Sequence, residues 1–306
     1  MRKATVARPE PLMEYLLGTL GLKRTAAKNL LKFGAVAVNG EVVRKFDHPL
    51  ASGDELTVSD LRTAVAVGQL AAARIEFVYE DDALIAVDKP SGLLTVATEN
   101  DKRDTLFYRL NEFLKRRDPK RPTRVSVVHR IDQGTSGLVL FAKSPQIKQT
   151  LQDAWSSIAK RYLAVVEGRP NPAEGTISSY ITESTARKSY GSHEAVEDNS
   201  KQATTHYRTL QTKDDWSLIE ARLETGRKHQ IRVHFSQIGC PIAGDELYEA
   251  ETDPCGRLAL HAFSLSLTHP TTGATLNLKA PLPKSLAKLF PDERAATKQG
   301  DRPNRG

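Results

Sequence analysis

The chain of 306 residues carries 44 lysine and arginine residues against 37 acidic ones, a formal net charge of +7. This excess favours a polyanionic partner without identifying one. The two cysteines, Cys240 and Cys255, show no metal-binding or redox spacing. No apolar run reaches membrane-spanning length, and the first residues lack the apolar segment of a signal peptide. We therefore expect a soluble cytoplasmic protein without structural disulfides and exclude a membrane-embedded one.

The N-terminal part of the chain predicts a small module of two helices and a short sheet. Its expected elements are two helices, a hairpin and a strand, at residues 11–20, 24–33, 35–43 and 55–58. The hairpin signal is Asn39-Gly40, which suits the two positive φ angles of a type I′ turn. We place the module at residues 1–64 and predict that the alanine-rich residues 65–74 are a linker.

Basic side chains gather on and beside the second predicted helix and where the chain leaves the hairpin. They are Lys23, Arg24, Lys28, Lys32, Arg44 and Lys45. An ordinary solvated helix face is the alternative, because nearby acidic residues offset part of the charge. On charge alone we favour RNA contact, with Lys28 and Lys32 as candidate contacts.

A larger α+β domain is predicted over residues 75–290. Its expected strands lie at residues 75–79, 83–87, 125–128, 139–142, 160–168, 203–210 and 216–223, and its first two helices at 105–116 and 146–155. Residues 175–207 are polar and predict turns and a variable insertion after a short stretch at 177–181. The polar tail at 291–306 is predicted to be disordered.

A basic segment, residues 115–124, has six basic residues against one acidic residue. Such a run is usually just solvated, but this one leads directly into the central motif and would guide phosphates there. Both interpretations stay open.

The central motif is residues 129–138, His-Arg-Ile-Asp-Gln-Gly-Thr-Ser-Gly-Leu. It breaks an apolar passage with three ionisable groups and two glycines. Asp132 should lie on a tight loop at the edge of a core, where a carboxylate is costly unless a cation or donors hold it. Arg130 is the nearest candidate donor. A purely structural loop, with Gly134 and Gly137 at positive φ, is the alternative.

A second charged segment spans residues 224–235, in which Gly226 precedes an expected helix. Backbone amides at this helix start, with Arg227 and Lys228 beside them, would form an anion site suited to a phosphate. His229 and His234 are five residues apart, off the spacing of a helical zinc pair. We therefore expect these histidines to make core hydrogen bonds or contact RNA.

Residues 129–138 resemble the sequence around the catalytic aspartate of RluA-type RNA pseudouridine synthases. That signature runs His-Arg-Leu-Asp, two variable residues, then Thr-Ser-Gly. Ile131 stands where leucine is frequent, and Gly134 stands where an acidic residue is common. The resemblance implies that Asp132 is the catalytic nucleophile.

Two later motifs extend the resemblance. Residues 160–168 match Lys-x-Tyr-x-Ala-x-Val-x-Gly at every fixed position. The strand alone favours a core or edge tyrosine, whereas the resemblance implies that Tyr162 stacks on the target base and is a candidate general base. Residues 225–234 match Thr-Gly-Arg-x-His-Gln-Ile/Leu-Arg-x-His, in which the arginine equivalent to Arg232 pairs with the catalytic aspartate. Glu249 departs from the family, where glycine is common.

The front module resembles a small RNA-binding domain first named from a small-subunit ribosomal protein, here called the S-four-type domain. In that family the second helix and the hairpin present the RNA-binding face. The resemblance adds to the charge argument for Lys28 and Lys32.

The resemblances imply an α+β fold, in which a mixed, largely antiparallel sheet flanked by helices follows a small αα-hairpin-type RNA-binding domain. They imply an isomerase without cofactor or metal that converts uridines in RNA, with ribosomal RNA favoured over tRNA. We expect a monomer that binds neither DNA nor membrane. The candidate catalytic residues are Asp132, Tyr162 and Arg232. The candidate substrate-binding residues are Lys28, Lys32, His129, Arg130, Arg227, Lys228 and Ile231.

Two rival functions remain open at this stage. A non-catalytic RNA-binding protein, such as a ribosome-assembly factor, would explain the charge and the front module but would leave the three candidate catalytic residues without a purpose. A metal-dependent nuclease would need clustered carboxylates for Mg²⁺, and the sequence shows no such cluster.

Overall fold

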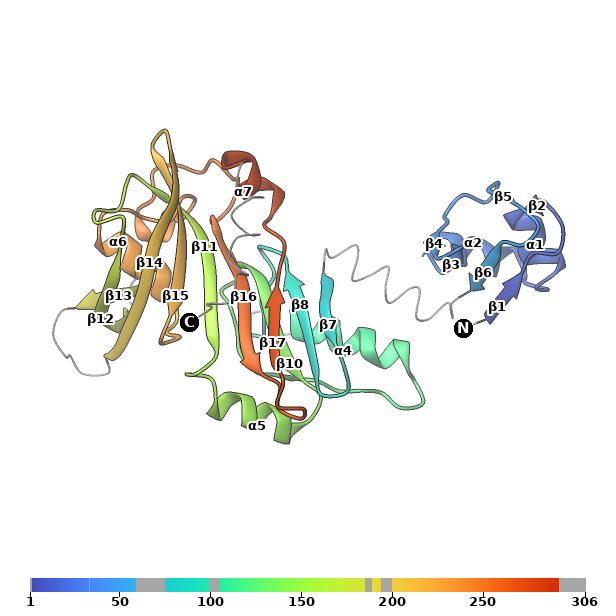
Figure 1. The fold of residues 1–306 in the computed structure, drawn as a ribbon, viewed down its shortest axis with the longest axis horizontal. Coiled ribbons are helices and arrows are strands. Elements are labelled where there is room, and N and C mark those ends of the chain that lie inside the picture. The colour runs from blue at the N-terminus through green and yellow to red at the C-terminus, as the bar shows by residue number, and fades with distance from the viewer. Residues whose placement is uncertain are drawn as a thin grey trace, which may run out of the picture. The chain divides into compact units, whose positions relative to one another are not determined.

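The computed structural model describes residues 2–32, 34–58, 75–98, 105–184, 189–193 and 200–291. Contacts divide the chain into two units, one of residues 1–76 and 107–125, the other of residues 77–106 and 126–306 (Figure 1). The expected linker at 65–74, the end of the front module at 59–64 and the tail beyond residue 291 lie outside the described residues. Among the helices that the structure describes, none is long and apolar enough to cross a membrane.

The N-terminal part of the first unit is a four-stranded sheet in the order β1-β6-β3-β4, with two helices and a two-stranded ribbon of β2 and β5. Its elements are β1 (Arg2–Thr5), β2 (Glu10–Pro11), α1 (Leu12–Gly18), α2 (Arg24–Lys32), β3 (Val36–Val38), β4 (Glu41–Val42), β5 (Pro49–Leu50) and β6 (Glu55–Val58). The two helices, the hairpin and the strand predicted from the sequence are confirmed, and β1, β2 and β5 are additional. Asn39 and Gly40 have φ angles of 51° and 86°, as the predicted turn requires.

The core of this module forms because each helix buries one face. Leu12 and Leu16 of α1 and Leu31 of α2 pack in one apolar cluster with Val36 and Leu56 of the sheet. The opposite face of α2 stays in solvent, and there both predicted contacts, Lys28 and Lys32, are exposed.

The helix predicted at residues 105–116 is α4 (Leu106–Arg117). Leu110 and Leu114 lie on its buried face. The side chain of Asn111 accepts a hydrogen bond of 3.1 Å from the amide of Val125, so the helix anchors the end of the basic segment.

The second unit is built on an eleven-stranded sheet in the order β13-β12-β14-β15-β11-β16-β10-β8-β7, with β17 on β16 and β9 on β10. Its strands are β7 (Glu76–Glu80), β8 (Leu84–Lys89), β9 (Ser126–Val127), β10 (Ser136–Ala142), β11 (Ala159–Glu167), β12 (Glu174–Ser184), β13 (Ser189–His193), β14 (Lys201–Lys213), β15 (Trp216–Leu223), β16 (Leu260–Thr268) and β17 (Thr275–Lys279). β10 and β16 pair in parallel, whereas β11 pairs antiparallel with both of its neighbours. The predicted mixed, largely antiparallel α+β fold is confirmed.

Short helices flank this sheet. They are α5 (Pro145–Asp153), α6 (Gln230–Gln237), the 3₁₀ turn η1 (Glu246–Tyr248) and α7 (Lys284–Leu289). Ile231 and Phe235 of α6 are buried in one core with Val165 of β11 and Ile219 of β15. A second core joins β8, β10 and α5. β10 thus contributes to one core and β11 to the other. The loop before β10 carries Asp132, β11 carries Tyr162, and α6 carries Arg232.

The prediction of turns and an insertion over residues 175–207 was wrong for the described part of that segment. Residues 174–184 form β12, which pairs with β14, and β14 begins at residue 201. Ile177 and Ile181 are buried on one face, together with Ser179, which bonds the buried His234. Serine and threonine make up five of the eleven residues of β12, so its pattern looked like a loop although threonine in particular suits strands.

Candidate active site

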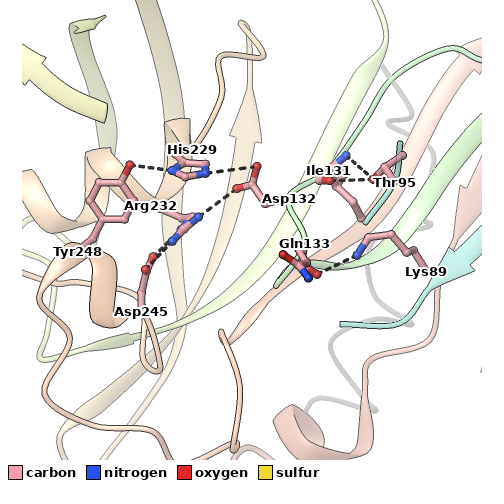
Figure 2. A network of polar contacts seen from close by, with 9 residues as sticks. All are labelled: Lys89, Thr95, Ile131, Asp132, Gln133, His229, Arg232, Asp245 and Tyr248. Carbon is pink, nitrogen blue, oxygen red and sulfur yellow. Dashed lines mark hydrogen bonds and ion pairs between the residues drawn. The ribbon is translucent and has the colours of Figure 1, made fainter. Parts of the chain in front are cut away.

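Asp132 lies on the loop between β9 and β10, and hydrogen bonds to the backbone on both sides hold that loop (Figure 2). Thr95 Oγ1 donates to the Ile131 carbonyl at 2.8 Å and accepts from the Ile131 amide at 3.3 Å. Lys89 Nζ donates to the Gln133 carbonyl at 3.1 Å. Because the residues before and after Asp132 are both bonded, the backbone that carries Asp132 is held on both sides.

Lys89 ends β8 as a fully buried lysine. Its ammonium also donates to the carbonyls of Pro90 at 3.0 Å and Leu93 at 2.7 Å, so all three donors have partners. Burial, with a smaller contribution from nearby Arg257, lowers the pKa of Lys89 to about 7. The sequence analysis assigned Lys89 no role.

The two glycines of the central motif differ in what they require. Gly137 has a φ of 113°, and a Cβ there would collide with the backbone of Ala262 on the adjacent strand β16. Gly134 is not at positive φ, so that part of the structural-loop interpretation was wrong for it. A Cβ at Gly134 would lie 3.2 Å from Leu258, which explains why a small residue fits here.

Two cationic or potentially cationic side chains face the Asp132 carboxylate. Arg232 Nη1 lies 3.6 Å from Oδ2, and His229 Nε2 lies 3.9 Å from Oδ1. Arg130, the donor expected from the sequence, forms no ion pair with Asp132 among the described residues. Desolvation raises the pKa of Asp132, and Arg232 opposes that rise most strongly.

Arg232 is itself held by a second carboxylate that the sequence analysis did not assign. Its Nε and Nη2 each donate to an oxygen of Asp245 at 2.7 Å, a bidentate pair. The guanidinium lies 4.9 Å from the ring centroid of Tyr248. Arg232 therefore faces Asp132 with its third nitrogen, Nη1, alone.

His229 is held by the same tyrosine. Its Nδ1 lies 2.8 Å from the hydroxyl of Tyr248, and the two rings meet edge to face at 5.7 Å. The backbone of His229 has a φ of 58°, an uncommon left-handed conformation for a residue other than glycine. Such conformations persist where the surrounding structure imposes them, frequently at functional sites.

A cavity of about 140 Å³ opens beside Asp132. Its lining residues are Arg130, Ile131, Asp132, Thr135, Tyr162, Leu223, Gly226, Arg227, Lys228, His229, Gln230, Ile231, Arg232 and Leu260. The three predicted catalytic residues, which are far apart in the sequence, thus line one cavity. Among the described residues, no group of three or more His, Cys, Asp or Glu side chains is arranged to hold a metal ion.

Tyr162 reaches the cavity from β11, where it pairs with Ala221 of β15 on one side and Ala262 of β16 on the other. Burial and the nearby Asp132 charge raise the pKa of its hydroxyl. At neutral pH this phenol is therefore protonated, and it offers the cavity an aromatic face.

The anion site expected at the helix start needs correction. α6 begins at Gln230, later than the sequence predicted, and His229 is its N-cap. The Gln230 side chain turns back and accepts from the Arg227 amide at 2.9 Å, so that amide already has a partner. The exposed side chains of Arg227 and Lys228 remain at the cavity.

His129 does not line the cavity, although the sequence predicts that it binds substrate. Its ring stacks on Trp155 with centroids 4.5 Å apart, and its Nε2 accepts from the Leu140 amide at 3.0 Å. Burial lowers its pKa to about 3, so the ring is neutral. This placement favours a structural role. Ile231, by contrast, is buried and lines the cavity, and its expected contact with substrate stays a prediction.

Comparison with protein families identifies the family of the chain that carries this site. Residues 83–237 match the family model described as RNA pseudouridylate synthase. The chain belongs to this family. It is an RNA pseudouridine synthase of the RluA type, an isomerase that modifies RNA.

Relatives and solved structures agree with this assignment of the synthase. An uncharacterized RNA pseudouridine synthase of Mycobacterium bovis is 37% identical over 87% of this chain and 89% of its own length. A ribosomal large subunit pseudouridine synthase D of Zymomonas mobilis is 33% identical over 88% of this chain and 89% of its own. The structure of human RNA pseudouridylate synthase domain containing 4 shares the fold, with a TM-score of 0.60 at 24% identity over 74% of this chain and 94% of that one.

Several residues of the synthase that build the site had no role in the sequence analysis. They are Lys89, Thr95, Asp245 and Tyr248. Each works through a contact with a residue far away in the chain, and local pattern carries no signal for such contacts. One feature of the sequence could have pointed to Lys89, which is a lysine at the end of an otherwise apolar strand. Glu249 has a φ of 67°, a left-handed conformation that glycine adopts without steric cost, which would account for the glycine of the motif that this segment resembles.

Proposed function

We propose that the synthase converts uridine to pseudouridine in RNA with Asp132 as the nucleophile. The observation that carries this proposal is a carboxylate, paired loosely with Arg232 at 3.6 Å, on a rigid loop of a cavity that also contains Tyr162. An enclosed carboxylate with a raised pKa is a stronger base than a solvated one. The contact with Arg232 opposes that rise and favours the ionised form that a nucleophile needs.

The reaction is an isomerisation and therefore needs no outside reactant. The bond between N1 of uracil and C1′ of ribose breaks, the base turns, and a bond forms between C5 and C1′. C5 then loses a proton, and N1 gains one, so atoms and electrons balance. Attack of Asp132 on the base and attack on the ribose both fit this balance.

Tyr162 is proposed to stack on the flipped base. Its raised pKa keeps the phenol neutral while Asp132 is ionised, which suits an aromatic surface rather than a resting base. Once Asp132 is covalently bound its charge disappears, and one of the two causes that raise the pKa of Tyr162 goes with it. A general-base role late in the reaction becomes easier at that point.

Phosphates next to the target uridine are proposed to bind at the rim of the cavity. Arg130, Arg227 and Lys228 all line the cavity and have exposed side chains. Such cations position the RNA backbone and carry no sequence information themselves. Extracting the base costs a few kcal/mol, which contacts of this kind help to offset.

The N-terminal module is proposed to be an S-four-type RNA-binding domain. Lys28 and Lys32 are exposed on α2. The guanidinium of Arg44 lies near the end of the same helix, with Nη2 3.1 Å from the position that a Cβ on Gly34 would occupy. These residues form a basic surface between α2 and the β3–β4 hairpin that fits an RNA backbone.

Ribosomal RNA is the proposed substrate, with tRNA as the second candidate. Relatives of Zymomonas mobilis and Neisseria meningitidis are named ribosomal large subunit pseudouridine synthase D. We further propose that the synthase works as a monomer in the cytoplasm, where its two free cysteines would stay reduced. Mapping pseudouridines in cellular RNA from a deletion strain identifies the substrate, and light scattering measures the oligomeric state.

Incubating RNA with the purified protein, with and without chelator, tests the proposed function. Formation of pseudouridine in both samples supports it. RNA binding without chemistry would instead support an assembly factor, and chelator-sensitive cleavage would support a nuclease.

A further inference from the structure

One short turn contacts both of the groups that face Asp132. Asp245 precedes η1 and Tyr248 ends it, and the Tyr248 amide donates to the Asp245 carbonyl at 3.0 Å. This hydrogen bond fixes the two residues relative to each other. The side chain of Asp245 contacts Arg232, and that of Tyr248 contacts both Arg232 and His229 (Figure 2).

Asp245 determines which nitrogen of Arg232 points at Asp132. The Asp245 side chain is 1% exposed, and its two oxygens accept from Nε and Nη2 of the guanidinium at 2.7 Å each. A planar fork held at two corners cannot rotate, so Nη1 faces Asp132 at 3.6 Å. Without Asp245 the guanidinium is free to turn toward Asp132 and bind it more tightly.

Tyr248 determines where the His229 ring lies. Its hydroxyl is 2.8 Å from Nδ1, on the opposite side of the imidazole from the nitrogen that faces Asp132. The ring of Tyr248 also lies 4.9 Å from the guanidinium of Arg232 and limits its movement out of plane. Tyr248 is 6% exposed and does not line the cavity.

We propose that Asp245 and Tyr248 are positioning residues of the synthase, which hold Arg232 on one oxygen of Asp132 and His229 on the other. This inference rests on the proposed role of Asp132 as nucleophile. The two residues touch no substrate. They set the distance and direction of the contacts that orient the carboxylate, so their loss should slow the reaction more than it weakens RNA binding.

Tyr248→Phe, Asp245→Asn and a control on the same turn, Glu246→Gln, test the proposal. Glu246 is exposed, so its substitution should change nothing. Tyr248→Phe keeps the ring and removes one hydrogen bond, and its single-turnover rate at saturating RNA should fall roughly five- to tenfold. The single-turnover rate of Asp245→Asn should fall about 100-fold, because the Asp132 carboxylate is displaced. The Kd for RNA should stay within about twofold in all three variants.

Rates of both variants within twofold of the control would overturn the proposal, as would equal losses in rate and in RNA affinity. Thermal unfolding of each variant shows whether it is folded. If Asp245→Asn does not fold, the rate of Tyr248→Phe alone decides whether the proposal holds.

Nitrogen NMR of the His229 ring, assigned with His229→Asn, gives a readout that needs no activity. Tyr248→Phe should shift the Nδ1 resonance, and Glu246→Gln should leave it unchanged. An unshifted resonance would contradict the proposal even if the parent makes pseudouridine. A parent that makes none would overturn the proposed function, whatever the resonance does.

Discussion

Arg232 reaches Asp132 with one nitrogen at 3.6 Å, within ion-pair range and beyond that of a direct hydrogen bond. The shorter bonds of the same guanidinium run to Asp245 at 2.7 Å. One cation thus serves two carboxylates unequally. The buried Asp245 accepts both short hydrogen bonds, and Asp132 is held only by the longer contact.

Arg232→Ala should therefore lose stability mainly through Asp245. Removing one partner of a buried pair costs on the order of 3 to 5 kcal/mol. Arg232→Lys keeps the charge but not the planar fork, so it should be more stable than the alanine variant and still slow. Chemical denaturation measures the stability of the two variants, and a single-turnover assay measures their rate. Arg222→Ala, on the exposed face of β15, is the control. Parent-like stability of Arg232→Ala would contradict this account.

The stability of Asp132→Asn should depend on pH in a defined direction. Burial raises the pKa of Asp132 from its ordinary value of 3.8. A raised pKa means that folding favours the protonated form, a contribution fully present below pH 3.8 and lost as pH rises through the folded pKa. At neutral pH the parent has lost stability through this shift, so Asp132→Asn should unfold at a higher denaturant concentration than the parent. The difference in stability between Asp132→Asn and the parent should become smaller as the pH falls. A parent that is the more stable protein at neutral pH would refute the sign.

Lys89→Met should loosen the loop that carries Asp132. The substitution keeps most of the volume and removes the donor to the carbonyls of Pro90, Leu93 and Gln133. The Gln133 carbonyl still accepts from the Gly92 amide at 2.8 Å, whereas the buried Leu93 bond is lost, at about 1–3 kcal/mol for a buried group left unsatisfied. We expect lower stability together with a slower single-turnover rate. Lys288→Met, an exposed change on α7, is the matched control. Normal turnover in a destabilised Lys89→Met would show that the loop keeps its geometry without the lysine.

Replacing both Lys28 and Lys32 by Gln should weaken RNA binding and flatten its dependence on salt. The log-log slope should fall by roughly 0.7 to 0.9 for each phosphate contact removed. The single-turnover rate at saturating RNA should not change, because neither residue belongs to the cavity. A slope equal to that of the parent would mean that this face of α2 does not touch the RNA.

The sequence predicted those features that local pattern encodes. Periodicity predicted the helices α2 and α4, and Asn39-Gly40 predicted the hairpin. The motif resemblance selected Asp132, Tyr162 and Arg232, which line one cavity in the structure. It could not show that Arg232 is shared with Asp245, because nothing in a pattern says which carboxylate a guanidinium meets in space.

The errors have physical causes of the same kind. The nearest cation in sequence, Arg130, forms no described pair with Asp132. Its side chain is exposed at the cavity, whereas Arg232 reaches the carboxylate from α6. The ring of His129 stacks on Trp155 and accepts a hydrogen bond from the Leu140 amide. These contacts depend on the packing of α5 against β10. The start of α6 is displaced because Gln230 folds back on the Arg227 amide.

The most direct test of the central claim is the single-turnover yield of pseudouridine with Asp132→Asn, measured beside its Kd for the same RNA. The amide keeps the size and shape of the carboxylate and removes the nucleophile. The account predicts no detectable pseudouridine and RNA affinity close to that of the parent. Product formation at a rate near that of the parent would contradict it.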